Sequence, residues 1–313
     1  MRVLITGGLG FIGSNLVRRA TAAGFNDISV FDNGLYGKDE HIEQGSATII
    51  KADLSNTAAL ADAVSEHDVI VHLAADTTVI GSIERPEYNF ETNVISTFNL
   101  LEAMRKNNKK KLLFASTGGA ITGEIDPPLN EDMPARPLSP YGASKLAAEG
   151  YLGAYNASFG MTNCAFRFSN VYGPGSFHKG SVVAAYFKAI LNNDPLIVYG
   201  DGEQTRDFVF VDDICDTLIR ALDSTQGGVF QLGSGTPTSV NSLIEKISRI
   251  TGKVSDSDIK YLDKRVGEVE KTYCDVSKAK NEIDYNPKVD LEGGLTRTWE
   301  WFLTQQSLFT KAA

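Results

Sequence analysis

Short apolar runs alternate with longer amphipathic stretches along the first half of the chain. Runs such as VIVHLAA and KLLFAST are apolar throughout, which is typical of strands buried on both faces of a parallel sheet. The alternation predicts an α/β fold built on a doubly wound parallel sheet. The predicted strands are Arg2–Thr6, Asp27–Asp32, Ala47–Asp53, Asp68–Ala75, Lys111–Thr117 and Thr162–Ser169, and the predicted helices are Ile12–Ala23, Thr57–Glu66, Arg85–Asn107 and Pro140–Phe159.

The pattern changes after Val171. The segment YGPGSFHKGS predicts a long loop, followed by a helix near Val182–Asn192 and a strand at Leu196–Tyr199. The later segments DFVFVDDI and Val229–Leu232 are apolar again, and we expect them to return to the first sheet. This predicts two interleaved α/β domains, a larger one of residues 1–169 plus about 208–232 and a smaller one of residues 170–207 plus 233–313.

Composition excludes several classes of protein. The 313 residues carry 39 acidic against 30 basic side chains, and this balance argues against binding nucleic acid by bulk charge. The three cysteines are widely spaced without a C-x-x-C, so the sequence predicts neither a disulfide framework nor a metal site with the four histidines. No apolar run approaches the roughly 18 residues of a membrane span, and MRVLITGG does not resemble a cleavable signal. We expect a cytoplasmic protein without membrane or nucleic-acid partners.

Gly7, Gly10 and Gly13 form a G-x-x-G-x-x-G sequence between the first predicted strand and helix. Glycine is needed where a turn is tight and where the backbone must approach a pyrophosphate, and the free N–H groups of the following helix attract that phosphate. Asp32, about 20 residues further on, has the spacing of an acidic residue that binds the adenosine ribose, which favours NAD over NADP. The alternative to dinucleotide binding by the glycine sequence is a loop that contains glycines by chance. The alternative to ribose binding by Asp32 is a plain turn at Asp32–Gly34.

Tyr141 and Lys145 are spaced to share one face of a predicted helix. The unperturbed pKa of tyrosine is about 10, but a neighbouring ammonium and a positive nicotinamide ring favour the phenolate and lower it. Ser116 and Thr117 end a predicted strand, where a hydroxyl can share its proton with Tyr141. Y-x-x-x-K is common on helix surfaces, so this pair alone is weak evidence for catalysis. The glycine loop, Asp32, the hydroxyl pair and the Tyr–Lys pair, occurring in this order, indicate the chemistry more specifically than any one motif.

These motifs resemble those of the extended short-chain dehydrogenase/reductases, and within them the UDP-glucose 4-epimerase group of the NAD-dependent epimerase/dehydratase family. The resemblance spans nearly the whole chain and includes GGLGFIG, FDN, ADL, HLAA, ETNVISTFNLLEA, FASTGGA, SPYGASK, RFSNVYGP, GDGEQTRDFVFVDDI and RVGEVEKTYCDVSKAK. It implies a Rossmann-like domain that binds NAD, a nucleotide-sugar substrate, and a homodimer formed through the Arg85–Asn107 and Pro140–Phe159 helices.

The resemblance also implies roles for individual residues. It implies Tyr141 as catalytic base and acid, Thr117 as its hydroxyl partner, and Lys145 on the nicotinamide ribose. The residues implied in cofactor binding are Gly7, Gly10, Phe11, Ile12, Gly13, Asp32, Asn33, Asp53, Leu54, Leu73, Ala74, Ala75, Asn93, Ser116, Tyr141, Lys145 and Phe168. Those implied in substrate binding are Thr117, Asn170, Arg206, Arg265, Glu268 and Thr272, with a bare surface arginine as the alternative for Arg265.

The implied reaction is epimerisation at C4 of a UDP-hexose or UDP-N-acetylhexosamine through a transient 4-keto sugar. Dehydratases and decarboxylases of this kind place carboxylates beside the catalytic hydroxyl, whereas glycines follow Thr117 here, with Glu124 and Glu131 further along. Thr272 stands where a bulky residue would exclude N-acetyl groups, so we expect them to be tolerated. Another nucleotide-sugar reaction (dehydration, decarboxylation or reduction) and a non-catalytic NAD-binding regulator are the alternatives.

Overall fold

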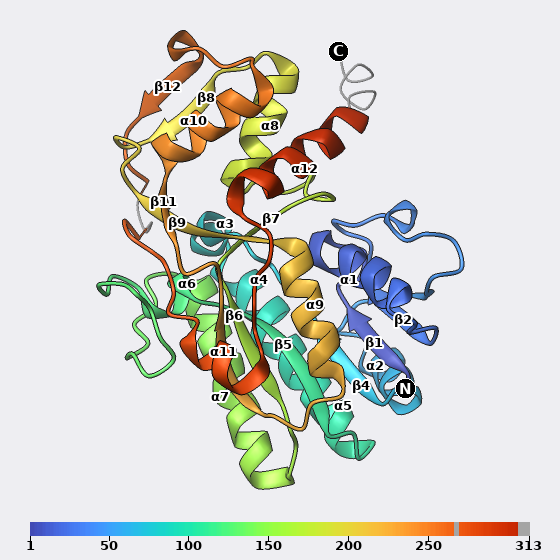
Figure 1. The fold of residues 1–313 in the computed structure, drawn as a ribbon. Coiled ribbons are helices and arrows are strands. Elements are labelled where there is room, and N and C mark those ends of the chain that lie inside the picture. The colour runs from blue at the N-terminus through green and yellow to red at the C-terminus, as the bar shows by residue number, and fades with distance from the viewer. Residues whose placement is uncertain (266–268, 306–313) are drawn as a thin grey trace.

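The computed structural model describes residues 1–265 and 269–305 and contains a seven-stranded sheet in the lower half of Figure 1. Its strand order is β10-β6-β5-β4-β1-β2-β3, and every neighbouring pair is parallel. The strands are β1 (Val3–Thr6), β2 (Ile28–Asp32), β3 (Thr48–Lys51), β4 (Val69–His72), β5 (Lys111–Thr117), β6 (Cys164–Phe168) and β10 (Gly228–Leu232). β1 and β4 are buried along their whole length, as predicted from their continuous apolar runs. The predicted Rossmann-like α/β fold is confirmed.

Helices cover both faces of this sheet (Figure 1). α1 and α9 pack together on one face, and α2, α5 and α7 lie on the other. The helices of this part are α1 (Phe11–Ala22), α2 (Thr57–Glu66), α3 (Val79–Glu84), α4 (Pro86–Phe90), α5 (Ser96–Lys106), α6 (Gly119–Thr122), α7 (Pro140–Phe159), α9 (Val211–Leu222) and α11 (Ser277–Ile283), with a 3-10 turn η1 (Asp39–His41) and a π-helical segment η2 (Glu91–Ile95).

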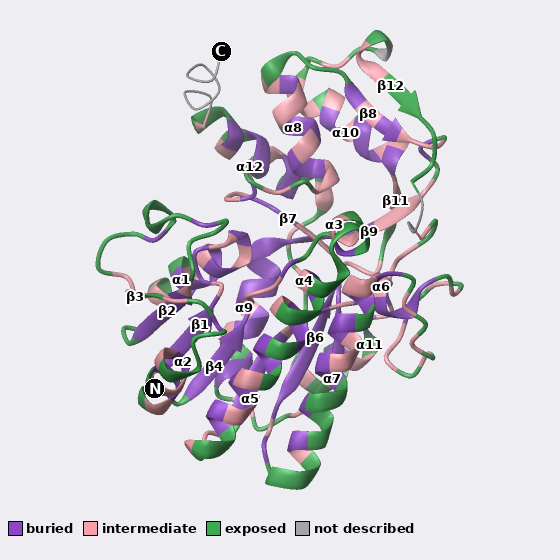
Figure 2. Cartoon of the chain, turned by 180° about the vertical axis from the view of Figure 1, so that it is seen from behind, coloured by how far each residue is buried: buried purple, intermediate pink, exposed green. Residues whose placement is uncertain are grey.

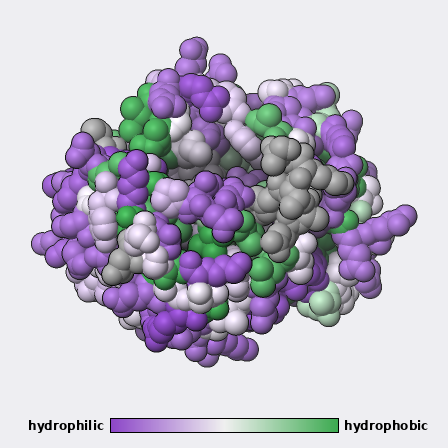
Figure 3. All heavy atoms as spheres, turned by 90° about the horizontal axis from the view of Figure 1, so that it is seen from above, coloured by the Kyte–Doolittle hydropathy of each residue, from purple (hydrophilic) through white to green (hydrophobic). Residues whose placement is uncertain are grey.

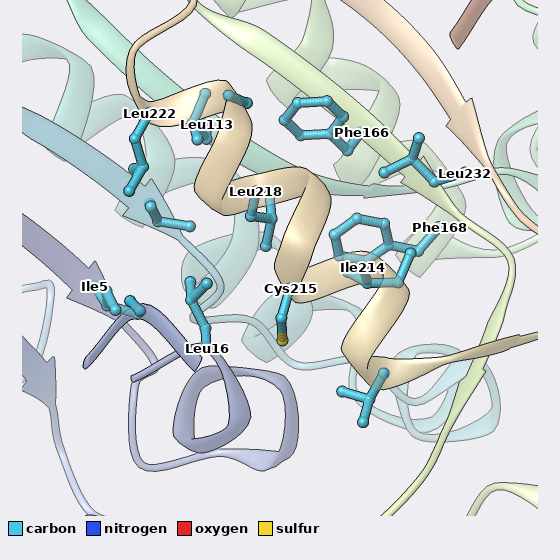
Figure 4. Packing of buried hydrophobic residues seen from close by; sticks show 14 of the residues in the cluster. Ile5, Leu16, Leu113, Phe166, Phe168, Ile214, Cys215, Leu218, Leu222 and Leu232 are labelled. Carbon is cyan, nitrogen blue, oxygen red and sulfur yellow. The ribbon is translucent and has the colours of Figure 1, made fainter. Parts of the chain in front are cut away.

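Alternate strand residues supply two hydrophobic cores. In the first, Ile214 and Leu218 of α9 face Leu113 and Phe166 of the sheet, as Figure 4 shows. The second core lies on the opposite face, where Leu4, Phe31 and Phe114 pack among residues of α2, α5 and α7. Both faces of the sheet are buried, which fixes the positions of its strands (Figure 2). Because the strands are parallel, their carboxyl ends lie together along one edge of the sheet.

A smaller part of the chain lies above this edge in Figure 1 and has its own core. Its sheets are β11-β9-β7 and β12-β8, and α8, α10 and α12 pack around them. Viewed from this side, most of the molecular surface is hydrophilic, with hydrophobic side chains in small groups (Figure 3). The elements are β7 (Asn170–Tyr172), α8 (Val182–Asn192), β8 (Leu196–Tyr199), β9 (Thr205–Phe210), β11 (Pro237–Ser239), α10 (Val240–Thr251), η3 (Asp256–Asp258), β12 (Ile259–Leu262) and α12 (Leu291–Thr304).

Two predicted elements differ from the structure. The DFVFVDDI segment was expected to return to the first sheet, but its strand β9 pairs with β7 and β11 in the smaller one. Its Asp207 carboxylate is buried and accepts hydrogen bonds from the backbone N–H groups of Ser234 and Gly235, in the segment between β10 and β11, at 2.7 and 3.1 Å. The chain returns to the large sheet through α9 and then β10. The predicted Arg85–Asn107 helix is divided by η2 into α4 and α5.

Candidate active site

A cavity of about 760 Å³ lies between the carboxyl ends of the sheet strands and the smaller part of the chain. Its walls hold most of the residues that the sequence singles out, drawn from segments far apart in the chain. The predicted residues that line it are Gly7, Gly10, Phe11, Ile12, Gly13, Asp32, Asn33, Asp53, Leu54, Leu73, Ala74, Ala75, Ser116, Thr117, Tyr141, Lys145, Phe168, Asn170, Arg206 and Thr272.

The glycine loop forms one end of the cavity. Gly7 has a φ of +70°, and a Cβ there would lie 2.5 Å from the backbone nitrogen of Ala74. A Cβ at Gly13 would collide with the carbonyl oxygen of Gly7. α1 begins at Phe11 without a side-chain cap or an acidic residue in its first turn, so its first N–H groups are available to an anion. These features fit the diphosphate of a dinucleotide.

Acidic side chains mark the part of the cavity next to β2 and β3. The carboxylate of Asp32 accepts hydrogen bonds from the backbone N–H groups of Leu9 and Gly34 at 3.1 and 2.8 Å, which fixes its orientation. Asn33 donates a 2.8 Å hydrogen bond to Asp53. Hydrogen bonds from the backbone and side chain of Ser55 and from Asn33 lower the pKa of the Asp53 carboxyl, which favours its charged form. Both carboxylates suit hydroxyl or amino donors of an adenosine.

Tyr141 and Lys145 project from the first turns of α7 toward the end of β5. The helix starts here because Ser139 caps it, accepting a hydrogen bond from the Gly142 N–H at 3.2 Å. Burial raises the pKa of Tyr141 to about 12, against the opposing effect of a hydrogen bond with Thr117. Burial lowers the pKa of Lys145 to about 7, and its ammonium donates to the carbonyl oxygen of Ala115 at 2.9 Å.

Ser116 and Thr117 point to different partners. The Ser116 hydroxyl donates to Glu149 at 2.6 Å, whereas Thr117 is hydrogen-bonded to Tyr141. Successive residues of a strand face opposite sides of a sheet, which explains the separation. Thr117 is therefore the hydroxyl of this pair that accompanies Tyr141.

Asn93 lies behind the cavity wall and does not line the cavity. It sits on η2, and its side chain donates to the Ser144 hydroxyl at 3.0 Å and to the Asp76 carbonyl oxygen at 2.9 Å. The Ser144 hydroxyl in turn donates to the carbonyl oxygen of Tyr141 at 2.8 Å. Asn93 thus holds the Tyr141 turn of α7 against the segment after β4.

The predicted substrate residues are only partly brought together. Asn170, Arg206 and Thr272 line the cavity, and Arg206 donates to the carbonyl oxygens of Thr205 and Glu270 at 2.8 and 3.2 Å. Arg265 is absent from the lining, and its guanidinium carbon lies 3.6 Å from the ring centroid of Tyr199. Glu268 falls outside the described residues.

Several residues of the cavity wall were not predicted as site residues. They include Tyr36, Asp76, Tyr88, His178, Lys179 and Gln231. Most of them lie on loops, where no periodic pattern indicates which side chains turn inward. HKGS, with two basic side chains inside a glycine-rich loop, was the available signal for His178 and Lys179.

Among residues 1–265 and 269–305, no group of three or more His, Cys, Asp or Glu side chains is arranged to hold a metal ion. In the same part of the chain, no helix combines the length and apolar character needed to cross a membrane.

The model of the NAD dependent epimerase/dehydratase family matches residues 3–233 of this sequence. The chain belongs to this family. It is 37% identical over 304 residues to a putative UDP-glucose 4-epimerase of Methanocaldococcus jannaschii, covering 96% of this chain and 97% of that one.

Two solved structures are similar over nearly the whole chain. UDP-glucose 4-epimerase of Thermotoga maritima with UDP-glucose has a TM-score of 0.93 at 35% identity, covering 97% of this chain and 99% of that one. UDP-N-acetylglucosamine 4-epimerase of Methanobrevibacter ruminantium in complex with UDP-N-acetylmuramic acid has a TM-score of 0.90 at 36% identity, covering 97% and 98%. NAD is the cofactor of this family, and the glycine loop and Asp32 fit it.

Proposed function

We propose that the protein is an NAD-dependent enzyme that epimerises C4 of a UDP-sugar. The observation that carries this proposal is the convergence of Tyr141, Thr117 and Lys145 on a cavity whose other end is the glycine loop. Proton transfer and dinucleotide binding then take place in one cavity. The similar epimerases agree with this function.

In the proposed reaction, Tyr141 removes the proton of the sugar 4-hydroxyl. It returns this proton after the 4-keto sugar has rotated within the cavity. Thr117 orients the phenol through their hydrogen bond, and Lys145 provides the ammonium that favours the phenolate. NAD held by the glycine loop and Asp32 would supply the group that takes up the C4 hydride and returns it to the opposite face of the sugar. We propose that Arg206 and Asn170, which also line the cavity, hold the substrate diphosphate while the sugar rotates.

The surroundings of Thr117 favour epimerisation over dehydration or decarboxylation. Those reactions need an acidic group beside the catalytic hydroxyl, but Gly118 and Gly119 occupy that position. Glu124 and Glu131 do not line the cavity, and the Glu131 carboxylate accepts a 2.6 Å hydrogen bond from the Gln231 backbone N–H. Neither of the two carboxylates that the sequence left as candidates lines the cavity.

The small side chain of Thr272 in the cavity lining supports acceptance of N-acetylhexosamines. A Cβ added to Gly119 would lie 3.0 Å from the Thr272 methyl group, so these two small residues pack against each other in the cavity wall. A larger side chain at either position would narrow the sugar pocket. Incubating the protein with UDP-glucose and UDP-GlcNAc at high enzyme concentration tests this directly, because turnover of UDP-glucose alone would contradict it.

The decisive experiment incubates the protein with UDP, dTDP, GDP and CDP sugars and identifies the products by NMR. A 4-epimer supports the proposal, whereas a 4-keto-6-deoxy sugar or a pentose would assign a different reaction. Tyr141→Phe serves as the matched variant, because it keeps the ring and loses only the hydroxyl. We expect no turnover with NAD still bound, and unchanged activity would remove the proposed mechanism.

We further infer a homodimer formed through α7 and the adjacent helices α4 and α5. The exposed face of α7 is small and uncharged at Ala143, Gly150 and Ala154, and next to it the Tyr151 and Phe98 rings lie 5.7 Å apart. Exposed apolar residues on neighbouring helices are common at subunit interfaces. Ala154→Glu should yield monomers in light scattering, and Ala58→Glu, an exposed alanine of α2, is the control.

We also propose a cytoplasmic location and a role in supplying sugar nucleotides for polysaccharide synthesis. The three cysteines are free and buried, which suits a reducing compartment. Cell fractionation with an antibody against the protein tests the location, and loss of a surface polysaccharide on gene deletion tests the role.

A further inference from the structure

The loop between β7 and α8, residues 173–181, lies against the start of α1. The side-chain amide of Asn15, on the first turns of α1, donates a 2.9 Å hydrogen bond to the carbonyl oxygen of Pro174. A Cβ at Gly175 would lie 3.0 Å from the same amide nitrogen, so the loop backbone runs close to the helix. This loop belongs to the smaller part of the chain and yet contacts the element that receives the dinucleotide diphosphate.

The end of the same loop crosses to the other side of the glycine loop. The ring of His178 stacks on His41 with 6.0 Å between centroids and a 15° interplanar angle. His41 Nδ1 lies 3.0 Å from the carbonyl oxygen of Leu9, within the glycine loop. Next along the chain, Lys179 Nζ donates a 3.2 Å hydrogen bond to Thr77, which follows β4. Residues 173–181 therefore span the glycine loop from α1 to the segment after β4.

Lys179 brings to the cavity a positive charge that the protein does not neutralise. It lines the cavity, and no ion pair joins its ammonium to a carboxylate within residues 1–265 and 269–305. Burial lowers the pKa of this ammonium, so its surroundings disfavour the charge that the side chain normally carries. An ammonium lining a cavity without a carboxylate partner is suited to bind an anion that enters with a ligand.

We propose that Lys179 binds the diphosphate of the bound dinucleotide from the side opposite the glycine loop, and so fastens residues 173–181 over the cofactor. The inference rests on the NAD binding of the proposed function. A sugar nucleotide also carries a diphosphate, but the contacts of this loop with Asn15, His41 and Thr77 all reach segments around the glycine loop. Retention of the cofactor is the property that this arrangement serves, because epimerisation requires the same dinucleotide to return its hydride.

The test measures how fast NAD leaves the purified holoenzyme, without substrate, by trapping released NAD with a coupled dehydrogenase. Lys179→Met keeps most of the apolar stem and removes the charge, and we expect release to become about tenfold faster or more. Lys179→Arg keeps the charge and should stay close to wild type. ADP-ribose should also bind the stripped Lys179→Met protein more weakly, whereas adenosine, which has no phosphate, should bind as before.

Lys188→Met distinguishes the effect of the Lys179 charge from the effect of loosening residues 173–181. Lys188 donates a 2.9 Å hydrogen bond to the carbonyl oxygen of Lys179, so its loss loosens the loop without removing the ammonium from the cavity. Release from Lys188→Met as fast as from Lys179→Met would show that loop packing is responsible and would overturn the proposal.

The affinity of the NAD-loaded protein for UDP, measured by calorimetry, distinguishes the two diphosphates. Unchanged UDP affinity in Lys179→Met supports the assignment to the cofactor. Weaker UDP binding with unchanged NAD release would assign Lys179 to the sugar nucleotide and overturn the proposal, and no change in either quantity would also overturn it. A wild-type protein that binds no NAD at all would instead refute the proposed function.

Discussion

The buried ion pair between Glu149 and Arg167 supports the floor of the active site, and its removal offers a quantitative test. The Glu149 carboxylate accepts hydrogen bonds from Arg167 Nη2 at 2.8 Å, from Arg167 Nε at 3.0 Å and from the Ser116 hydroxyl at 2.6 Å. Only 5% of the Glu149 side chain and 6% of the Arg167 side chain are exposed. The pair thus ties α7, which carries Tyr141, to β5 and β6.

Glu149→Gln keeps the size of the side chain and removes its charge, leaving a guanidinium buried without a counter-ion. Breaking a buried pair from one side costs about 3–5 kcal/mol, a large part of the about 5–15 kcal/mol by which a domain is stable. We expect the free energy of unfolding in urea, at a fixed NAD concentration, to fall by about that amount. The pKa of Lys145 should fall further below about 7, since the Glu149 charge raises it.

The double variant Glu149→Gln, Arg167→Met is the control for this reasoning. Replacing both partners removes the buried unpaired charge, so the double variant should be more stable than Glu149→Gln alone. If Glu149→Gln costs less than about 1 kcal/mol, or if the double variant loses the sum of both single losses, the carboxylate does not neutralise Arg167 as argued.

Three further predictions concern the cofactor loop and the proton-transfer pair. Gly7→Ala should abolish NAD binding in calorimetry because its methyl group meets the backbone of the segment after β4, whereas Gly24→Ala, also at positive φ but with open space around it, should bind NAD normally. Burial lowers the pKa of Lys145 in the folded protein to about 7, so the unfolded chain holds that proton more tightly. The free energy of unfolding should therefore rise from pH 7 to about 10.5. Lys145→Met should remove this rise in urea titrations. The Asp76 charge adds to the effect of burial in raising the pKa of Tyr141, so Asp76→Asn should move the rising limb of the pH–rate profile to lower pH, and an upward shift would contradict this.

Local signals in the sequence predicted the fold and one end of the site well. The bounds of α7 and α8 match the predicted ranges, because Ser139 and Gly160 provide a cap and a left-handed stop for α7 and Asn193 provides a stop for α8. The glycine loop and the Tyr141 turn were also visible, since their chemistry depends on spacing within one strand–turn–helix segment. Such features need no knowledge of distant contacts.

The features that the sequence did not predict depend on contacts between segments that are distant in the chain. An apolar run shows that a strand is buried but not which sheet it joins, and β9 joins the small sheet through its pairing with β7 and β11. Arg265 was assigned to the substrate through the family resemblance, and that role stays a prediction; its guanidinium lies over the Tyr199 ring, and Arg265 is not among the residues that line the cavity. Lys179 enters the cavity because its loop crosses the glycine loop, a path that no local pattern encodes.

The distribution of charged side chains between the two ends of the cavity explains how a chain with a net charge of −9 can bind anionic ligands. Within the cavity lining, Asp32 and Asp53 lie where hydroxyl or amino donors are expected, and Lys179 and Arg206 line the regions proposed for phosphate. Burial pushes Tyr141 toward its neutral phenol and Lys145 toward its neutral amine, so burial by itself disfavours the phenolate–ammonium pair that catalysis needs. A positive charge beside the phenol favours the phenolate but disfavours the ammonium of Lys145, whereas the phenolate, once formed, favours that ammonium. We therefore expect removal of the sugar proton to depend on a positive charge beside Tyr141, which the nicotinamide ring of NAD would supply.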